Sequence, residues 1–114
     1  MNTVDAIPKS RRIRELNDRF RTTFTGGKVM MTSGVAALAP VIGQKVIDAV
    51  KGFADFDEGN DPHKEHDFGC VEVEGDNYFF KVDYYSSDMS QGSEDPADPE
   101  QTTRVLTIMR ADEY

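Results

Sequence analysis

The chain has 114 residues, of which 38% are hydrophobic and 30% are charged, and its formal net charge is −8. This length and composition suit one soluble domain with a single core. The single cysteine, Cys70, excludes an intramolecular disulfide and is typical of a reducing compartment, so we expect a cytoplasmic protein. The longest apolar run, residues 35–42, is too short to cross a bilayer, and the basic N-terminal region does not resemble a signal peptide.

The charge is divided between the two halves of the chain. Residues 1–53 contain nine Lys and Arg against four Asp and Glu, whereas residues 54–114 contain four against seventeen. The second half therefore has a net charge of about −13. Charge of one sign on part of a small protein indicates something about its partners more than about its fold.

Two helices are predicted in the first half. After a flexible N-terminus over residues 1–8, the first helix spans residues 9–23, where apolar side chains recur at steps of three and four at Ile13, Leu16 and Phe20. A helical turn is predicted at residues 34–38. The second helix spans residues 40–52, since Pro40 suits a first helical turn, where its missing N–H costs nothing.

Four strands are predicted, over residues 28–32, 68–74, 77–85 and 103–110. The second and third form a hairpin around a Gly75-Asp76 turn, which sets Val73 opposite Tyr78. One hairpin face is then apolar, and the other is mostly polar. The last strand has a continuous apolar centre, which favours an interior place in the sheet. These elements predict one α+β domain over residues 9–114, of order α-β-α-β-β-β. We expect a four-stranded, mainly antiparallel sheet with both helices on one face.

Two predicted loops are strongly acidic and are called the 54–67 loop and the 86–101 loop. With the polar face of the hairpin they form a predicted acidic surface for a basic partner. Its candidate residues are Asp55, Asp57, Glu58, Asp61, Glu72, Glu74, Asp83, Glu94, Asp95 and Asp98. A nucleic-acid-binding protein is the natural partner, because carboxylates can stand in for phosphates.

The densest chemical cluster lies in the 54–67 loop, which contains both histidines. Imidazole and carboxylate groups are zinc ligands, so a metal site would use His63, His66 and one carboxylate: Asp61, Glu65 or Asp67. The spacing matches no self-sufficient metal motif, and a loop that bonds its own backbone is the simpler interpretation. We therefore expect no cofactor, with zinc at His63, His66 and Asp67 as the alternative.

The predicted first helix is basic, with Lys9, Arg11, Arg12, Arg14, Arg19 and Arg21. Such a helix could contact phosphates. The acidic remainder of the chain would repel them, and no aromatic side chains are interleaved on the polar side. A solvated helix face is the simpler interpretation, so we do not expect direct binding of nucleic acid.

Four stretches resemble a small family of uncharacterised proteins, found mostly in proteobacteria and often on mobile elements. They are IRELNDRFR (13–21), NDPHKEHDFG (60–69), FFKVDYY (79–85) and GSEDPADPEQTTRVLTIMRADEY (92–114). The family is a domain of unknown function, so it transfers no catalytic residues. The resemblance implies an intracellular bacterial protein, and the mobile-element setting favours a role against host defence systems.

Three functional hypotheses follow. The leading one is a non-enzymatic, acidic protein-binding module, in its concrete form an inhibitor of a host defence nuclease or of a CRISPR complex. The second is an enzyme, using metal or acid–base chemistry at His63, Glu65, His66 and Asp67. The third is a nucleic-acid-associated regulator that uses the arginine-rich first helix. The balance leans away from an enzyme, and no membrane contact is expected.

Overall fold

The computed structural model describes residues 7–114. Its first half contains four elements. They are helix α1 (Lys9–Thr23), strand β1 (Lys28–Met31), the short helix α2 (Ser33–Ala36) and helix α3 (Pro40–Lys51). The second half contains strands β2 (Phe68–Val73), β3 (Asp76–Ser86) and β4 (Thr102–Arg110), and ends in a 3₁₀ turn, η2 (Ala111–Glu113). The predicted N-terminus falls outside the described residues, apart from Ile7 and Pro8.

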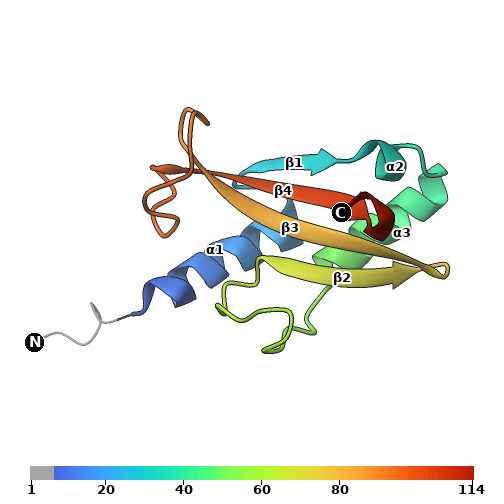
Figure 1. Cartoon of the computed structure of the whole chain (residues 1–114), viewed down its shortest axis with the longest axis horizontal. Helices are drawn as coiled ribbons and strands as arrows, with labels where there is room; N and C mark the ends of the chain where they lie inside the picture. The colour runs from blue at the N-terminus through green and yellow to red at the C-terminus, as the bar shows by residue number, and fades with distance from the viewer. Residues whose placement is uncertain (1–6) are drawn as a thin grey trace, which may run out of the picture.

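The four strands form one sheet in the order β1-β4-β3-β2 (Figure 1). Helices α1 and α3 lie behind this sheet in the figure, so both cover the same face. The predicted α+β class, the order of the elements and the interior position of the last strand are confirmed.

The sheet is mixed, and in this it differs from the mainly antiparallel prediction. Strands β2 and β3 pair antiparallel, as do β3 and β4, but β1 pairs parallel to β4. A parallel pair needs a long crossover connection rather than a hairpin. Residues 32–101 provide it, because α2, α3 and the β2–β3 hairpin all lie between the two strands in the sequence.

The predicted register of the hairpin is wrong by two residues. Val73 pairs with Asp76 and Val71 with Tyr78, so the turn consists of Glu74 and Gly75. Both turn residues have positive φ, 53° for Glu74 and 84° for Gly75, which is typical of tight turns that match the strand twist. A shift of two residues leaves every side chain on its predicted face, because strand side chains alternate with period two.

The core lies between this sheet and the helices. Its fully buried members come from every layer: Phe20 of α1, Val46 and Val50 of α3, Tyr78 and Phe80 of β3, and Leu106 and Ile108 of β4. Gly69 of β2 is needed here, because a Cβ at this position would lie 2.4 Å from the ring of Phe80. The aromatic ring therefore occupies the space that a side chain on β2 would take.

The buried stripe of α1 differs from the predicted one. Ile13 and Phe20 are buried as expected, but Leu16 is only half-buried, and the stripe includes Asn17 and Arg21 instead. Both polar side chains are hydrogen-bonded. Arg21 donates to Asp18 Oδ1 and to the backbone oxygen of Phe53, each at 3.0 Å. Burial of polar groups is tolerated where such bonds replace those to water.

Candidate functional site

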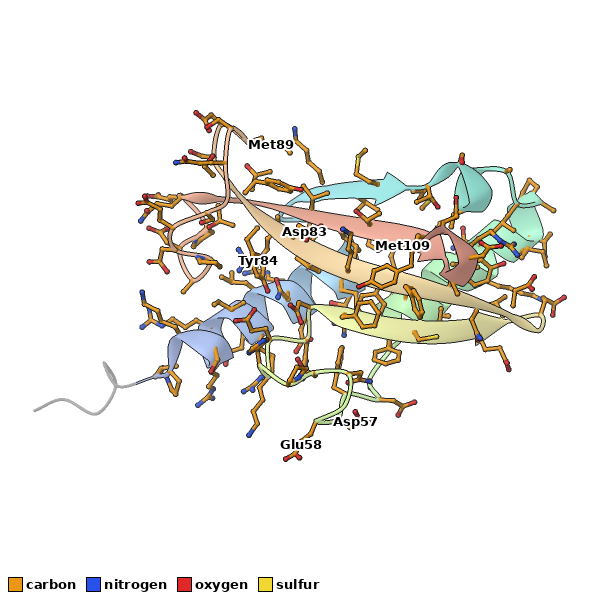
Figure 2. All side chains as sticks on the ribbon, viewed as in Figure 1. Asp57, Glu58, Asp83, Tyr84, Met89 and Met109 are labelled. Carbon is orange, nitrogen blue, oxygen red and sulfur yellow. The ribbon has the colours of Figure 1, made fainter. Side chains whose placement is uncertain are left out.

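The face of the sheet away from the helices, here called the open face, is more apolar than the sequence indicated. Strand β3 directs Phe79, Lys81, Asp83 and Tyr85 to this face, opposite its buried Tyr78, Phe80 and Val82. In the paired register Phe79 lies opposite Met109 and Asp83 opposite Val105, so β4 contributes apolar side chains that the hairpin pattern alone could not reveal. In Figure 2, the open face is turned to the viewer.

One end of the open face is covered by the C-terminus. The ring of Tyr114 lies 5.3 Å from that of Phe79 and 5.9 Å from that of Phe68, centroid to centroid. The carboxylate of Glu113 holds this end in place, because it accepts bonds from the Thr32 hydroxyl at 2.6 Å and the Gly34 amide at 2.9 Å. These bonds lower the pKa of Glu113, with the Thr32 hydroxyl as the main cause.

The other end of the open face is an apolar hollow, here called the methionine groove. It has a volume of about 420 Å³, and its apolar lining consists of Met30, Met31, Tyr85, Met89 and Val105. Met30 is 54% exposed, and Met31 and Met89 are each 38% exposed. Lys28, Thr32 and Thr107 complete the lining. Figure 2 shows Met89 in the loop that follows β3, on the side of the sheet where β1 lies.

The ten candidate residues of the acidic surface fall into three groups. Asp61 is buried, so it does not belong to a surface. Three form ion pairs with lysines: Glu74 with Lys45 at 3.6 Å, Asp83 with Lys81 at 3.1 Å and Asp95 with Lys9 at 3.6 Å. The rest form no ion pair among the described residues: Asp55, Asp57, Glu58, Glu72, Glu94 and Asp98. Figure 2 places Asp57 and Glu58 at the tip of the 54–67 loop, pointing away from the sheet.

Many carboxylates of the acidic loops also shape the loops themselves. Asp57 Oδ1 accepts bonds from the amides of Gly59 and Asn60, both at 2.9 Å, and Asp88 Oδ1 accepts from the Ser90 amide at 3.0 Å. The Ser86 hydroxyl is the main cause that lowers the pKa of Asp88 to about 2. The Gln101 side chain likewise lowers the pKa of Asp98. The 86–101 loop is thus folded by carboxylates that stay ionised at neutral pH.

The half-buried ring of His66 contacts Phe56, Asp18 and Asp61. Its ring stacks on Phe56, with centroids 3.8 Å apart, while Nδ1 lies 2.8 Å from Asp18 Oδ1 and Nε2 lies 3.5 Å from Asp61 Oδ2. Asp61 also accepts the backbone amides of Glu65 and His66, each at 3.0 Å. His66, Phe56 and Asp61 line a small hollow of about 240 Å³, together with Arg14 and Lys64.

The alternative zinc ligands are not brought together. His63 is exposed, whereas burial raises the pKa of the half-buried Asp67. Across residues 7–114, no group of three or more His, Cys, Asp or Glu side chains is placed to hold a metal ion. Cys70 is exposed on the open face of β2, as the hairpin pattern predicted.

The sequence did not reveal a polar network under α1. Asn17 is fully buried; its Nδ2 donates to the Tyr84 hydroxyl at 2.7 Å, and its Oδ1 accepts from Arg104 Nε at 2.8 Å. The Tyr84 hydroxyl donates in turn to Glu65 Oε1 at 2.9 Å. The one available signal was Arg104 itself, a charged residue inside a strand otherwise predicted to be interior.

Comparison with known proteins places the chain in a family but assigns it no activity. None of the described helices is both long and apolar enough to cross a membrane. No curated protein and no solved structure shows significant similarity to the chain. Residues 31–113 match the sequence profile of a family described as "Protein of unknown function (DUF3768)". The match begins after α1, so the stretch at residues 13–21 lies outside it. The chain therefore belongs to the DUF3768 family, whose function is unknown.

Proposed function

We propose that the protein is a non-enzymatic binding module that docks a basic protein partner on the open face of its sheet. The observation that carries the proposal is the methionine groove, an exposed apolar hollow of about 420 Å³ that none of the described helices lines. The 86–101 loop, which supplies Met89, also contains Asp88 next to it in the sequence, a carboxylate without an ion pair among the described residues.

The groove has the composition of a contact surface. Methionine and tyrosine are enriched at the centres of protein interfaces, and flexible methionine side chains adapt to different partners. Three exposed methionines gather here, whereas the exposed Val41 on α3 is a single apolar side chain on the opposite layer. Single exposed apolar residues need no explanation, but a gathered set indicates an interaction site.

The charge of the protein selects the kind of partner. The second half of the chain has a net charge of about −13, and Asp88, Glu94 and Asp98 of the 86–101 loop form no ion pair among the described residues. A basic surface would be attracted and oriented by this field, and the attraction would weaken with salt. Nucleic-acid-binding proteins present such surfaces. The mobile-element setting implied by the family resemblance narrows the proposal to an inhibitor of a restriction or CRISPR system.

No observation favours the two alternatives. An acid–base or metal site in the 54–67 loop would need His66, but both of its ring nitrogens face carboxylates within the fold. Direct binding of nucleic acid by α1 would use arginines of which Arg21 is buried and Arg11 is paired with Glu15 at 3.1 Å. We therefore propose neither.

Affinity capture from lysate of the encoding organism, at low and high salt, tests the proposal. Wild-type protein should retain a basic protein at low salt and release it at high salt. The double variant Met30→Glu/Met89→Glu should lose it, because charges would enter the apolar centre of the contact. Val41→Glu is the matched control and should retain it, since Val41 is exposed on the helical layer.

A second pair of variants tests the electrostatic contribution to binding of the basic partner. Glu72 is exposed on β2 and Asp48 is exposed on α3, so Glu72→Lys and Asp48→Lys change the net charge equally on opposite layers. We expect weaker binding for Glu72→Lys alone. Equal effects of the two would mean that net charge acts without a defined face, and unchanged capture by the methionine double variant would refute the proposed groove.

A further inference from the structure

We propose that a second, separate hollow binds a small oxyanion, namely the phosphate or carboxylate group of a small molecule. It lies between α1, the turn after α1 and the segment that leads into β4, and its volume is about 340 Å³. Its lining includes Leu16, Arg19, Thr25, Pro99, Thr102 and Arg104. Pockets of this size with apolar walls and a few placed polar groups are typical of small-molecule sites.

Arg104 is the buried charge of this hollow. The residue is 3% exposed, and it forms no ion pair with any described carboxylate. Two of its five N–H groups are used, Nε by Asn17 Oδ1 and one on Nη2 by the backbone oxygen of Pro96. A buried charge is costly unless it is paired, so an oxyanion would supply the missing partner.

The free nitrogen of Arg104 is accessible. Among the described residues, the fully enclosed side-chain nitrogen and oxygen atoms without a partner are Arg21 Nε and Tyr78 Oη. Arg104 Nη1 has no hydrogen-bond partner within residues 7–114 and is not one of these enclosed atoms, so part of it is accessible, and Arg104 lines the hollow. Burial is the main cause that lowers the pKa of Arg104, while the nearby Tyr84 and Glu65 act in the opposite direction.

Arg19 provides a second positive group at the same hollow. It is exposed on α1 and forms no ion pair in the described part of the chain. Two guanidinium groups around one cavity can hold a phosphate or carboxylate through several charge-assisted hydrogen bonds. No carboxylate lines the cavity, while Leu16 and Pro99 provide apolar wall.

Two electrostatic effects oppose the binding of an anion in this cavity, and both are weaker than the attraction by Arg104 and Arg19. The C-terminus of α1 has a partial negative charge, of about half a unit, which faces two full positive charges. The protein is also acidic overall, with a net charge of −8. Screening over about 8 Å at physiological ionic strength reduces the effect of distant exposed carboxylates on the cavity. Glu65 is near enough for its charge to act on the pKa of Arg104 in the upward direction, but the two side chains form no ion pair in the described structure.

This site is independent of the partner surface proposed above, because it lies on the helical side of the sheet and shares no residue with the methionine groove.

The proposed oxyanion site is built from two parts of the chain. Arg104 and Thr102 lie within the family-matched residues, whereas Leu16 and Arg19 come from α1, which precedes the match. The presence of α1 is therefore needed to close the cavity.

Titration of the ¹⁵N-labelled full chain with inorganic phosphate, and separately with acetate, tests the proposal by NMR. We expect saturable shifts of the Arg104 side-chain Nε–H resonance and of the backbone amides of Thr25 and Gly26, which line the cavity. The anion that saturates at lower concentration identifies whether a phosphate or a carboxylate is the preferred group.

Arg19→Ala should weaken the binding roughly tenfold, the loss of one charge-assisted contact. Arg14→Ala is the matched control, because Arg14 lies on the same helix beside the 54–67 loop and lines a different hollow. It should change the affinity less than about twofold. Absence of saturable shifts with both anions, or equal losses in both variants, would overturn the proposed site.

Discussion

Asn17 Oδ1 accepts a hydrogen bond from Arg104 Nε at 2.8 Å, and both side chains are buried. The Nδ2 group of the same amide donates to the Tyr84 hydroxyl at 2.7 Å and to the backbone oxygen of Glu65 at 2.9 Å. A single side chain thus joins α1 to β3, to β4 and to the 54–67 loop. It holds the helix over the sheet and orients the guanidinium of the proposed oxyanion site.

Replacement of Asn17 should be costly. Asn17→Ala leaves Arg104 Nε buried without a partner, and we expect a loss of about 2–4 kcal/mol in the free energy of unfolding, partly offset by the better helix propensity of alanine. Urea unfolding followed by circular dichroism measures it. Asn77→Ala, at an exposed position of β3, should change stability by less than about 0.5 kcal/mol. Similar values for the two variants would show that the network contributes little.

The Tyr84 hydroxyl should make stability depend on alkaline pH. Burial is the main cause that raises its pKa above the ordinary value of 10.0. The unfolded chain then releases the proton first, so this contribution is present below about pH 10 and is lost as pH rises above it. Tyr84→Phe should be less stable than wild type at pH 8, and the difference should shrink by about pH 11. A constant difference in urea titrations would contradict this assignment.

Asp67 should make stability depend on pH in the acidic range. Its pKa is raised above 3.8, mainly by burial, so its contribution to stability is present below that value and is lost as pH rises through the folded pKa. Asp67→Asn should therefore be more stable than wild type at pH 7 and nearly equal to it at about pH 3. Asp55→Asn, at an exposed position of the same loop, serves as control. A destabilised Asp67→Asn protein at pH 7 would show that the carboxylate is needed in its ionised form.

The two histidines should respond very differently to mutation. His66→Ala removes the ring stacked on Phe56 and a bond to Asp18, and we expect a loss of about 1–3 kcal/mol. His63→Ala should be neutral within about 0.5 kcal/mol, since His63 is exposed. Thermal unfolding with and without added zinc measures both effects. A zinc-dependent stabilisation lost in both variants would revive the metal site.

The sequence predicts much of the fold, because helices and strands with a regular spacing of apolar residues can be recognised from local sequence alone. The amphipathic helices, the alternating hairpin and the apolar centre of β4 were all recognised from local patterns. The parallel pairing of β1 had no local signal, because its partner β4 lies over seventy residues away. The hairpin register was missed because Glu74 adopts a positive φ, a conformation for which glutamate gives no sequence indication.

The candidate sites were harder to predict for a physical reason. Polar residues are expected at the surface, yet Asn17, Asp61 and Arg104 are buried, and the partners of Asn17 lie 48 to 87 positions away. The acidic loops were identified, but the methionine groove was not. Its apolar residues come from β1, β3, β4 and the 86–101 loop, and each of these contributes only one or two apolar side chains to the groove.

Hydrogen–deuterium exchange of the protein, alone and saturated with its captured basic partner, tests the central claim most directly. The account predicts slower exchange of the amides of β1 and of residues 86–92, around the methionine groove, with little change over α3. Protection confined to α1 and α3, with unchanged exchange at Met30, Met31 and Met89, would contradict docking on the open face.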